Sequence, residues 1–200
     1  MIKLFESLPD GVTVDGRFFK CNFDFRNVLK MLDVMQREDI YPDARDYVCI
    51  KCVYSHRIPP KFASRLYKAI CDVLFEKTPE TGTERLTSFE QDAALIRAAF
   101  RQVYNIDLFR DRLSWFEFTE LLHGLPEGNK YEEVIGIRAR PMPPANKYNA
   151  KEREWLLKAK QQVRIRLTER EAAKKYEADT SKIFNGIMSM MQKEVKTGNG

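Results

Sequence analysis

Histidine is scarce in this sequence, and its scarcity limits the chemistry that the chain can support. The only two histidines are His56 and His123, so a Ser-His-Asp or Cys-His arrangement would have to use one of them as its base. A glycine-rich phosphate loop and an H-E-x-x-H zinc motif are both missing. We therefore expect a protein that is not an enzyme and that has no cofactor.

Long apolar runs are absent as well. No stretch reaches the roughly 18 apolar residues that a transmembrane helix needs, so a membrane partner is not expected. The opening residues, MIKLFESLPDG, lack the apolar region of a secretory signal peptide. We expect a soluble cytosolic protein whose 4 cysteines are reduced thiols rather than a disulfide framework.

What the chain does contain is typical of a folded protein. Of its 200 residues, 44% are apolar and 12% are aromatic, which argues against disorder. The net charge of +5 is uneven, because residues 147–177 hold 10 Lys and Arg against 5 Asp and Glu. This segment includes a basic stripe of Lys158, Lys160, Arg164, Arg166 and Arg170. One interpretation is a solvated helix face, and the alternative is a nucleic-acid-binding structural protein that uses residues 147–177.

Local signals predict a mainly α-helical fold that begins with a β-hairpin. Two short alternating runs flank Asp15-Gly16, a pair that favours a tight hairpin turn. Apolar residues then recur at helical spacing after the predicted cap Asp24. Further helices are predicted over 43–56, 60–76, about 88–104, 113–123 and 130–138, with Asn105 as a left-handed stop and Asn129 as a cap.

Four segments follow from these signals. We predict a hairpin over 1–23 and a helical core over 24–140. Residues 141–149 are a proline-rich connector that cannot be helical throughout. A basic and then methionine-rich helical segment follows over 150–200, opened by a capping pair of Asn149 and Glu152.

Cys49, Cys52 and His56 form the sequence's most metal-like pattern. On one continuous helix these residues would share a face, and Cys71 or His123 could complete a tetrahedral zinc site. A second C-x-x-C pair is missing, and buried cysteine commonly acts as a small apolar residue. We therefore favour buried thiols over a metal.

Residues 98–125 are rich in aromatic side chains interleaved with arginines. This density fits either a surface that stacks nucleic-acid bases or the interior of a helical domain. Helical spacing and capped ends favour the interior. We predict two helices that meet at an Asn105-Ile106-Asp107 corner and are held together by Phe100, Trp115 and Phe118.

The end of the chain is the best candidate for a partner-binding surface. Methionine-rich amphipathic helices bind apolar grooves because the unbranched side chain adapts to its partner. The alternative is that this segment folds back as a last core helix. The candidate residues are Ile183, Phe184, Ile187, Met188, Met190 and Met191.

Several stretches of the chain together resemble a known family. The matching pieces are Phe89-Glu90-Gln91-Asp92, Ala98-Ala99-Phe100, Tyr104 with Ile106-Asp107-Leu108, Leu113, Trp115, Phe118, Gly124-Leu125, NFDFRNVL at 22–29 and IGIRARP at 135–141. They resemble the tail assembly chaperones of long-tailed bacteriophages, the family called phage gene product fifteen. The likeness covers about 20–167. Ser88, Asn105 and Phe116 depart from the family's Asp, Gly and Trp, which indicates a divergent member.

The resemblance implies a binding protein without catalytic residues. Such chaperones are helical proteins, encoded just before the tape measure protein, that coat it and keep it soluble. They recruit tail tube subunits and are absent from the finished virion. The expected partners are therefore the tape measure protein, the tail tube protein and further copies of this chain, in the host cytoplasm.

Overall fold

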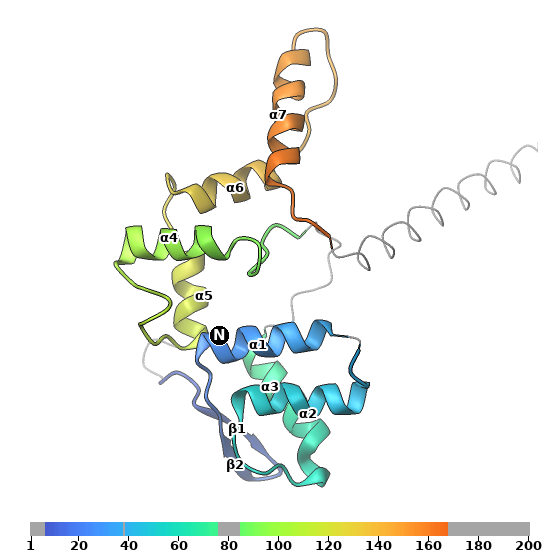
Figure 1. Cartoon of the computed structure of the whole chain (residues 1–200), viewed down its shortest axis with the longest axis vertical. Helices are drawn as coiled ribbons and strands as arrows, with labels where there is room; N and C mark the ends of the chain where they lie inside the picture. The colour runs from blue at the N-terminus through green and yellow to red at the C-terminus, as the bar shows by residue number, and fades with distance from the viewer. Residues whose placement is uncertain (1–6, 38, 76–84, 168–200) are drawn as a thin grey trace, which may run out of the picture.

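A computed structural model describes residues 7–37, 39–75 and 85–167, and these form a mainly α-helical fold with an N-terminal hairpin, as predicted (Figure 1). The elements are β1 (Gly11–Val14), β2 (Arg17–Lys20), α1 (Phe25–Gln36), α2 (Pro42–Val53), the 3-10 turn η1 (Pro60–Phe62), α3 (Ala63–Leu74), α4 (Ala93–Tyr104), α5 (Trp115–His123), α6 (Lys130–Ala139) and α7 (Ala150–Val163). Figure 1 shows the hairpin, α2 and α3 at one end, α4 to α6 in the middle and α7 projecting from the other end. None of the described helices has the length and apolar character needed to span a membrane.

The hairpin turns at Asp15-Gly16, as predicted. Asp15 and Gly16 both have positive φ, 51° and 75°, which is the backbone of a type I′ turn. The strands pair antiparallel with Val12 opposite Phe19. Phe19 is 1% exposed and packs edge-on against Tyr54 and Phe62. The hairpin therefore shares the hydrophobic core of the helices instead of standing alone.

Side-chain caps mark the starts of three helices. The Asp24 carboxylate accepts from the Arg26 N–H, and the Asn129 side chain accepts from the Glu132 N–H, so both predicted caps are confirmed. Ser114 and Glu117 form a reciprocal capping box at the start of α5. The Ser-x-x-Glu spacing carries this signal, and our sequence reasoning missed it.

Two of these helix starts also pair with each other. The Phe25 N–H donates to the Leu113 carbonyl at 3.1 Å, and the Trp115 N–H donates to the Phe23 carbonyl at 2.7 Å. These bonds form an isolated antiparallel bridge between Asp24 and Ser114. The bridge joins residues that are 90 positions apart in the sequence. These backbone bonds therefore hold the starts of α1 and α5 side by side.

The aromatic residues Phe100, Trp115 and Phe118 of the stretch at 98–125 lie inside the fold, as predicted, whereas Phe109 is exposed. Phe118, 2% exposed, stacks on Phe25 and Phe100 with ring centroids 4.7 and 5.4 Å apart. Trp115 stacks on Phe118 at 5.9 Å, and its indole N–H donates to the Leu74 carbonyl at 3.1 Å. These rings therefore join α1, α3, α4 and α5 in the core.

The start of α4 differs from the prediction. We expected the helix to begin near 88, but it begins at Ala93. Ser88 Oγ accepts from the Gln91 N–H at 3.3 Å, and the Asp92 carboxylate accepts from the Ser88 N–H at 2.9 Å. These short side-chain bonds form a turn over 88–92 in place of the first helical turn. Just before this turn, the Thr87 hydroxyl lies 3.1 Å from the Tyr131 hydroxyl on α6.

Asn105 ends α4 in the left-handed conformation, with φ 56° and ψ 27°, as predicted. Asn105→Gly should preserve or slightly raise the free energy of unfolding, since glycine adopts this conformation without a Cβ clash. Asn105→Val should lower it by about 1–2 kcal/mol, because a β-branched residue is strained there. Urea denaturation of the two variants checks this, and equal stability of both would contradict it.

The two helices predicted over 43–56 and 60–76 end earlier than expected. The region 60–76 opens with η1 before α3, and α2 ends at Val53. The connector 141–149 is non-helical and α7 begins at Ala150, as predicted. The Asn149–Glu152 capping pair is not formed, because the Asn149 Oδ1 accepts from the Asn146 N–H at 3.0 Å. Only residues 150–167 of the predicted C-terminal segment are described.

Candidate functional site

The predicted partner-binding residues lie outside the described part of the chain. This applies to Ile183, Phe184, Ile187, Met188, Met190 and Met191, and also to Arg170 of the basic stripe. Their contact with a partner stays a prediction. The candidate surfaces that the structure does describe are considered next.

Cys49, Cys52 and His56 do not share a helix face, which corrects the sequence interpretation. Because α2 ends at Val53, His56 lies beyond the helix and packs edge-on against the Tyr54 ring at 5.6 Å. Cys49 is fully buried and its thiol donates to the Met31 carbonyl at 3.8 Å. Within residues 7–37, 39–75 and 85–167, no three His, Cys, Asp or Glu side chains are placed to hold a metal ion.

The thiols of this region are protonated near neutral pH. Burial, with smaller contributions from Cys52, Asp46 and Cys71, raises the pKa of the Cys49 thiol to about 11. Burial likewise raises the pKa of the Cys71 and Cys52 thiols. Because the thiolate is the nucleophilic form, these residues are poorly suited to redox or covalent chemistry near neutral pH.

The acidic residues around the α4–α5 corner have structural roles. The Asp107 carboxylate accepts from the Phe109 N–H at 3.0 Å and from Arg101 at 2.6 Å, and Arg97 and Arg110 lie at 3.9 Å. The hydrogen bond from Phe109 and these positive charges hold the pKa of Asp107 below its ordinary value. Asp107 therefore shapes the turn that carries Phe109.

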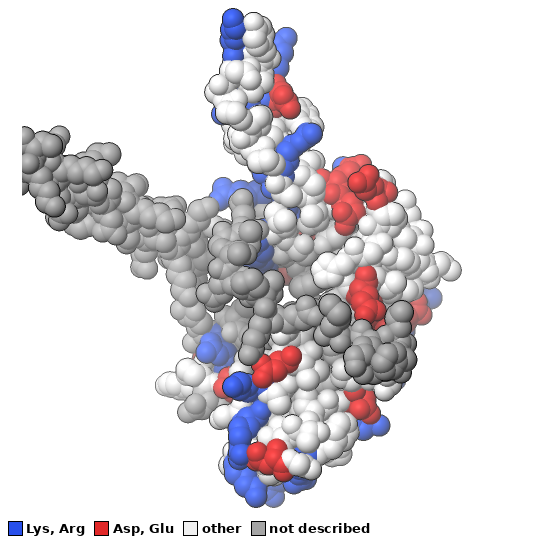
Figure 2. Space-filling model, turned by 180° about the vertical axis from the view of Figure 1, so that it is seen from behind, with Lys and Arg blue, Asp and Glu red and all other residues white. Residues whose placement is uncertain are grey.

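The basic stripe is only partly available to an anionic partner. Lys158 pairs with Glu154 at 2.7 Å, and the Lys160 ammonium donates to the Arg138 carbonyl at 2.6 Å. Figure 2 shows basic side chains along the projecting α7 and at the opposite end of the molecule, with acidic side chains among them. Nucleic-acid binding by residues 147–177 stays an untested alternative.

An apolar groove lies between α1 and α4, and we call it the α1–α4 groove. Its volume is about 450 Å³. Its floor reaches the aromatic core at Phe25 and Phe118, and its outer edge is formed by Phe109, which is 72% exposed. The full lining is Phe25, Arg26, Leu29, Lys30, Asp33, Phe89, Ala93, Ile96, Arg97, Leu108, Phe109 and Phe118.

The arginines at the edge of the groove are engaged within the fold. The Arg97 guanidinium lies 4.1 Å from the centre of the Phe109 ring, a cation–π contact. Arg26 donates to the carbonyls of Leu108 and Asp111 at 2.9 and 2.6 Å. The apolar floor of the groove suits the apolar face of a helix.

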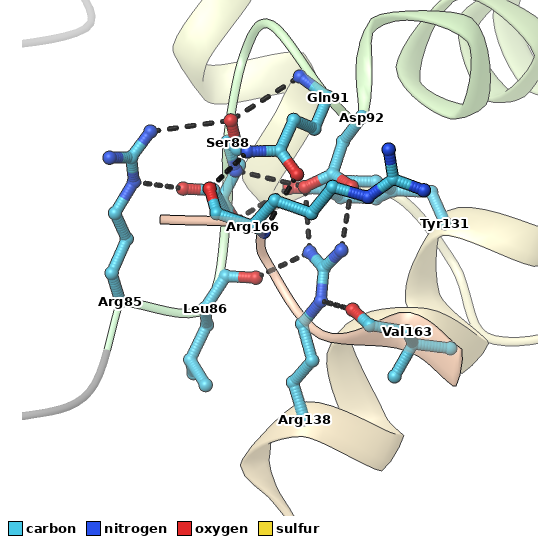
Figure 3. Close-up of polar contacts among 10 residues, drawn as sticks. Arg85, Leu86, Ser88, Gln91, Asp92, Tyr131, Arg138, Val163 and Arg166 are labelled. Atoms are coloured by element: carbon cyan, nitrogen blue, oxygen red, sulfur yellow. Dashed lines mark hydrogen bonds and ion pairs between the residues drawn. The ribbon is translucent and has the colours of Figure 1, made fainter. Parts of the chain in front are cut away.

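A buried polar network lies where α4 begins, outside the α1–α4 groove. We call it the Asp92–Arg138 network (Figure 3). Arg138 on α6 binds both carboxylate oxygens of Asp92 at 2.7 and 2.8 Å. It also donates to the Leu86 and Val163 carbonyls at 2.8 and 2.6 Å. Arg138 thus connects the segment before α4, α6 and the end of α7 through one side chain.

The Asp92 side chain is 2% exposed, and its pKa reflects two opposed effects. Burial alone would raise the pKa of this carboxyl. The hydrogen bonds from Arg138 and the Ser88 N–H, with the charges of Arg138 and Arg85, outweigh burial and lower the pKa. Asp92 is therefore ionised at neutral pH and depends on Arg138 for compensation.

Gln91, which lies next to this network, binds the backbone of Arg166 near the end of the described chain. Its side-chain amide donates to the Arg166 carbonyl at 2.7 Å and accepts from the Arg166 N–H at 2.8 Å. Figure 3 shows Gln91 and Arg166 next to the Asp92–Arg138 pair. The chain therefore leaves the described fold beside the start of α4.

Sequence reasoning identified neither the groove nor the network. The groove combines residues from 25–33, 89–97 and 108–118, and the ion pair joins residues 46 positions apart. The family resemblance was a local signal: in the match at Phe89-Glu90-Gln91-Asp92, Phe89 lines the groove, Gln91 binds Arg166 and Asp92 binds Arg138. The match at 135–141 contains Arg138 itself.

Comparison with known proteins places most of the described fold in one family. A family model described as "Bacteriophage Gp15 protein" matches residues 4–165. The match contains the groove and both partners of the buried ion pair. No curated protein and no solved structure matches the chain.

Proposed function

We propose that this chain, which belongs to the bacteriophage Gp15 protein family, is a tail assembly chaperone. In this role it binds the tape measure protein in the host cytoplasm, helps to recruit tail tube subunits and is not retained in the virion. It carries out no catalysis and acts as several copies along one partner chain.

The α1–α4 groove is the observation that carries this proposal. Its lining is mostly apolar, and Phe109 stands at its edge where a partner can reach it. Exposed apolar surface of this kind commonly marks a protein-binding site. A groove between two helices is the geometry that receives an amphipathic helix, so a long helix-rich protein with repeated apolar faces is a fitting ligand.

The size of the groove also suits a contact that must be reversed. A volume of about 450 Å³ accommodates a few side chains and not a whole domain interface. Affinity for a long partner then comes from many copies binding in parallel, and each copy can leave on its own as tube subunits arrive. A chaperone that is released during assembly needs this combination.

Co-expression with the tape measure protein of the same phage tests the proposal. We expect the soluble fraction of the tape measure protein to rise several-fold when this chain is present. Ala93→Glu places a charge in the groove at an exposed position and should remove most of that gain, while leaving the fold intact because glutamate is favourable in a first helical turn.

Ala98→Glu is the matched control, since Ala98 is exposed on the same helix but does not line the groove. This variant should support solubility as well as the native chain does. Unchanged solubility of the tape measure protein with the native chain would overturn the proposed function. Equal loss in both variants would refute the role of the groove.

A further inference from the structure

The described chain ends close to the α1–α4 groove. Gln91 binds the backbone of Arg166 through two hydrogen bonds, and Phe89 and Ala93, two residues to either side of Gln91, line the groove. Figure 1 shows the last described residues beside the segment that precedes α4. Whatever follows Leu167 therefore starts next to this surface.

The chain beyond Leu167 is long enough to reach the groove. Fifteen residues, 168–182, separate Leu167 from the apolar stretch that begins at Ile183. Fifteen residues span about 22 Å as a helix and about 50 Å when extended. Arg166 binds Gln91, and the groove residues Phe89 and Ala93 lie two residues along the chain from Gln91, at most about 7 Å between Cα atoms, so either length reaches the groove.

The apolar stretch has the chemistry that the groove accepts. Residues 183–191 contain no charged side chain, and their apolar positions recur at helical spacing. Adaptable methionine side chains suit a groove lined by aromatic rings, since sulfur packs favourably against them. The positions on this face are Ile183, Phe184, Ile187, Met190 and Met191.

We infer that residues 183–191 occupy the α1–α4 groove of the same chain when no partner is bound. A tether this short gives an effective concentration on the order of millimolar, so binding within one chain outcompetes binding to a second copy at micromolar concentration. The segment then shields Phe109 and the groove from non-specific association, and a partner helix gains access by displacing it. The inference does not rest on the chaperone role, because both surfaces belong to this chain.

Hydrogen exchange of the full-length protein, followed by mass spectrometry, tests the inference. An isolated helix of about ten residues is marginal in water, so strong protection of 183–191 requires a tertiary contact. We expect amides in 183–191 to exchange at least about tenfold more slowly than in the free peptide. This protection should be the same at about 1 and 50 μM protein, since the contact is intramolecular.

Two variants and two matched controls identify the contact. Ala93→Glu in the groove and Ile187→Asp in the segment should each abolish the protection. Ala98→Glu, outside the groove, and Ser189→Asp, on the opposite side of the predicted helix, should keep it. Absence of protection in the native chain, or protection that survives Ala93→Glu, would overturn the inference. Protection that disappears on dilution would also overturn it and assign the segment to a second copy.

Discussion

Replacing Phe118 with alanine is expected to lower the free energy of unfolding by about 3–5 kcal/mol. The ring is 2% exposed and touches the rings of Phe25, Phe100 and Trp115, which come from three helices. Because these rings enclose it on several sides, they cannot collapse into the cavity without moving a helix. The lost burial and the residual cavity therefore both contribute.

Thermal unfolding followed by circular dichroism measures this effect. For a domain of 150–250 residues, each kcal/mol shifts the melting temperature by about 2–4 °C, so a decrease of about 6–20 °C is expected. Phe109→Ala is the matched control, because Phe109 is 72% exposed and should change stability by no more than about 0.5 kcal/mol. Similar losses in both variants would show that the aromatic core is not centred on Phe118.

Replacing Arg138 with methionine is expected to destabilise the protein by about 3–5 kcal/mol at neutral pH. Methionine keeps much of the aliphatic bulk but removes the guanidinium that binds Asp92, Leu86 and Val163. The ionised Asp92, 2% exposed, would then keep only the Ser88 N–H bond and the more distant charge of Arg85 to offset its burial. The contact that holds the end of α7 is lost at the same time.

A double-mutant cycle separates these effects. Asp92→Asn removes the buried charge while keeping an acceptor for the Ser88 N–H. The variant that combines Asp92→Asn with Arg138→Met should be more stable than Arg138→Met alone, with a coupling of at least about 1 kcal/mol. Strict additivity in urea denaturation would show that the two side chains act independently.

The same pair predicts a pH dependence with a defined sign. In the native protein the pKa of Asp92 lies below its ordinary value of 3.8, so its stabilising contribution is present at neutral pH and is lost as pH falls below about 4. Without Arg138, burial dominates and raises that pKa, so the penalty of the variant disappears as the carboxyl is protonated. The stability difference between native protein and Arg138→Met should therefore shrink from pH 7 to pH 4. A constant difference would contradict this.

Local features of this fold were predictable because they depend on a few neighbouring residues. The Asp15-Gly16 turn and the caps at Asp24, Asn105 and Asn129 are formed by contacts within about four positions. Backbone preference and short side-chain hydrogen bonds decide such features before any tertiary contact forms. Ser114 shows that the same kind of signal was present even where it was not used.

Other local predictions failed because the polar groups that would have formed the predicted feature hydrogen-bond to other residues. The helix predicted from about 88 begins at Ala93, because the Asp92 carboxylate accepts from the Ser88 N–H and binds Arg138. The helix that would have aligned Cys49, Cys52 and His56 ends at Val53. At this end of α2, the Val53 carbonyl accepts a hydrogen bond at 2.7 Å from the N–H of Asn22, which lies just after β2.

The sequence by itself determined the helical class, the hairpin, most helix starts and the resemblance to a phage family, since periodicity and motif spacing are properties of neighbouring residues. Only the tertiary structure decided that Phe25, Ala93 and Phe109 line one groove and that Asp92 meets Arg138. Those contacts join segments dozens of residues apart, and packing of apolar surface selects them among many pairings that the sequence pattern allows equally.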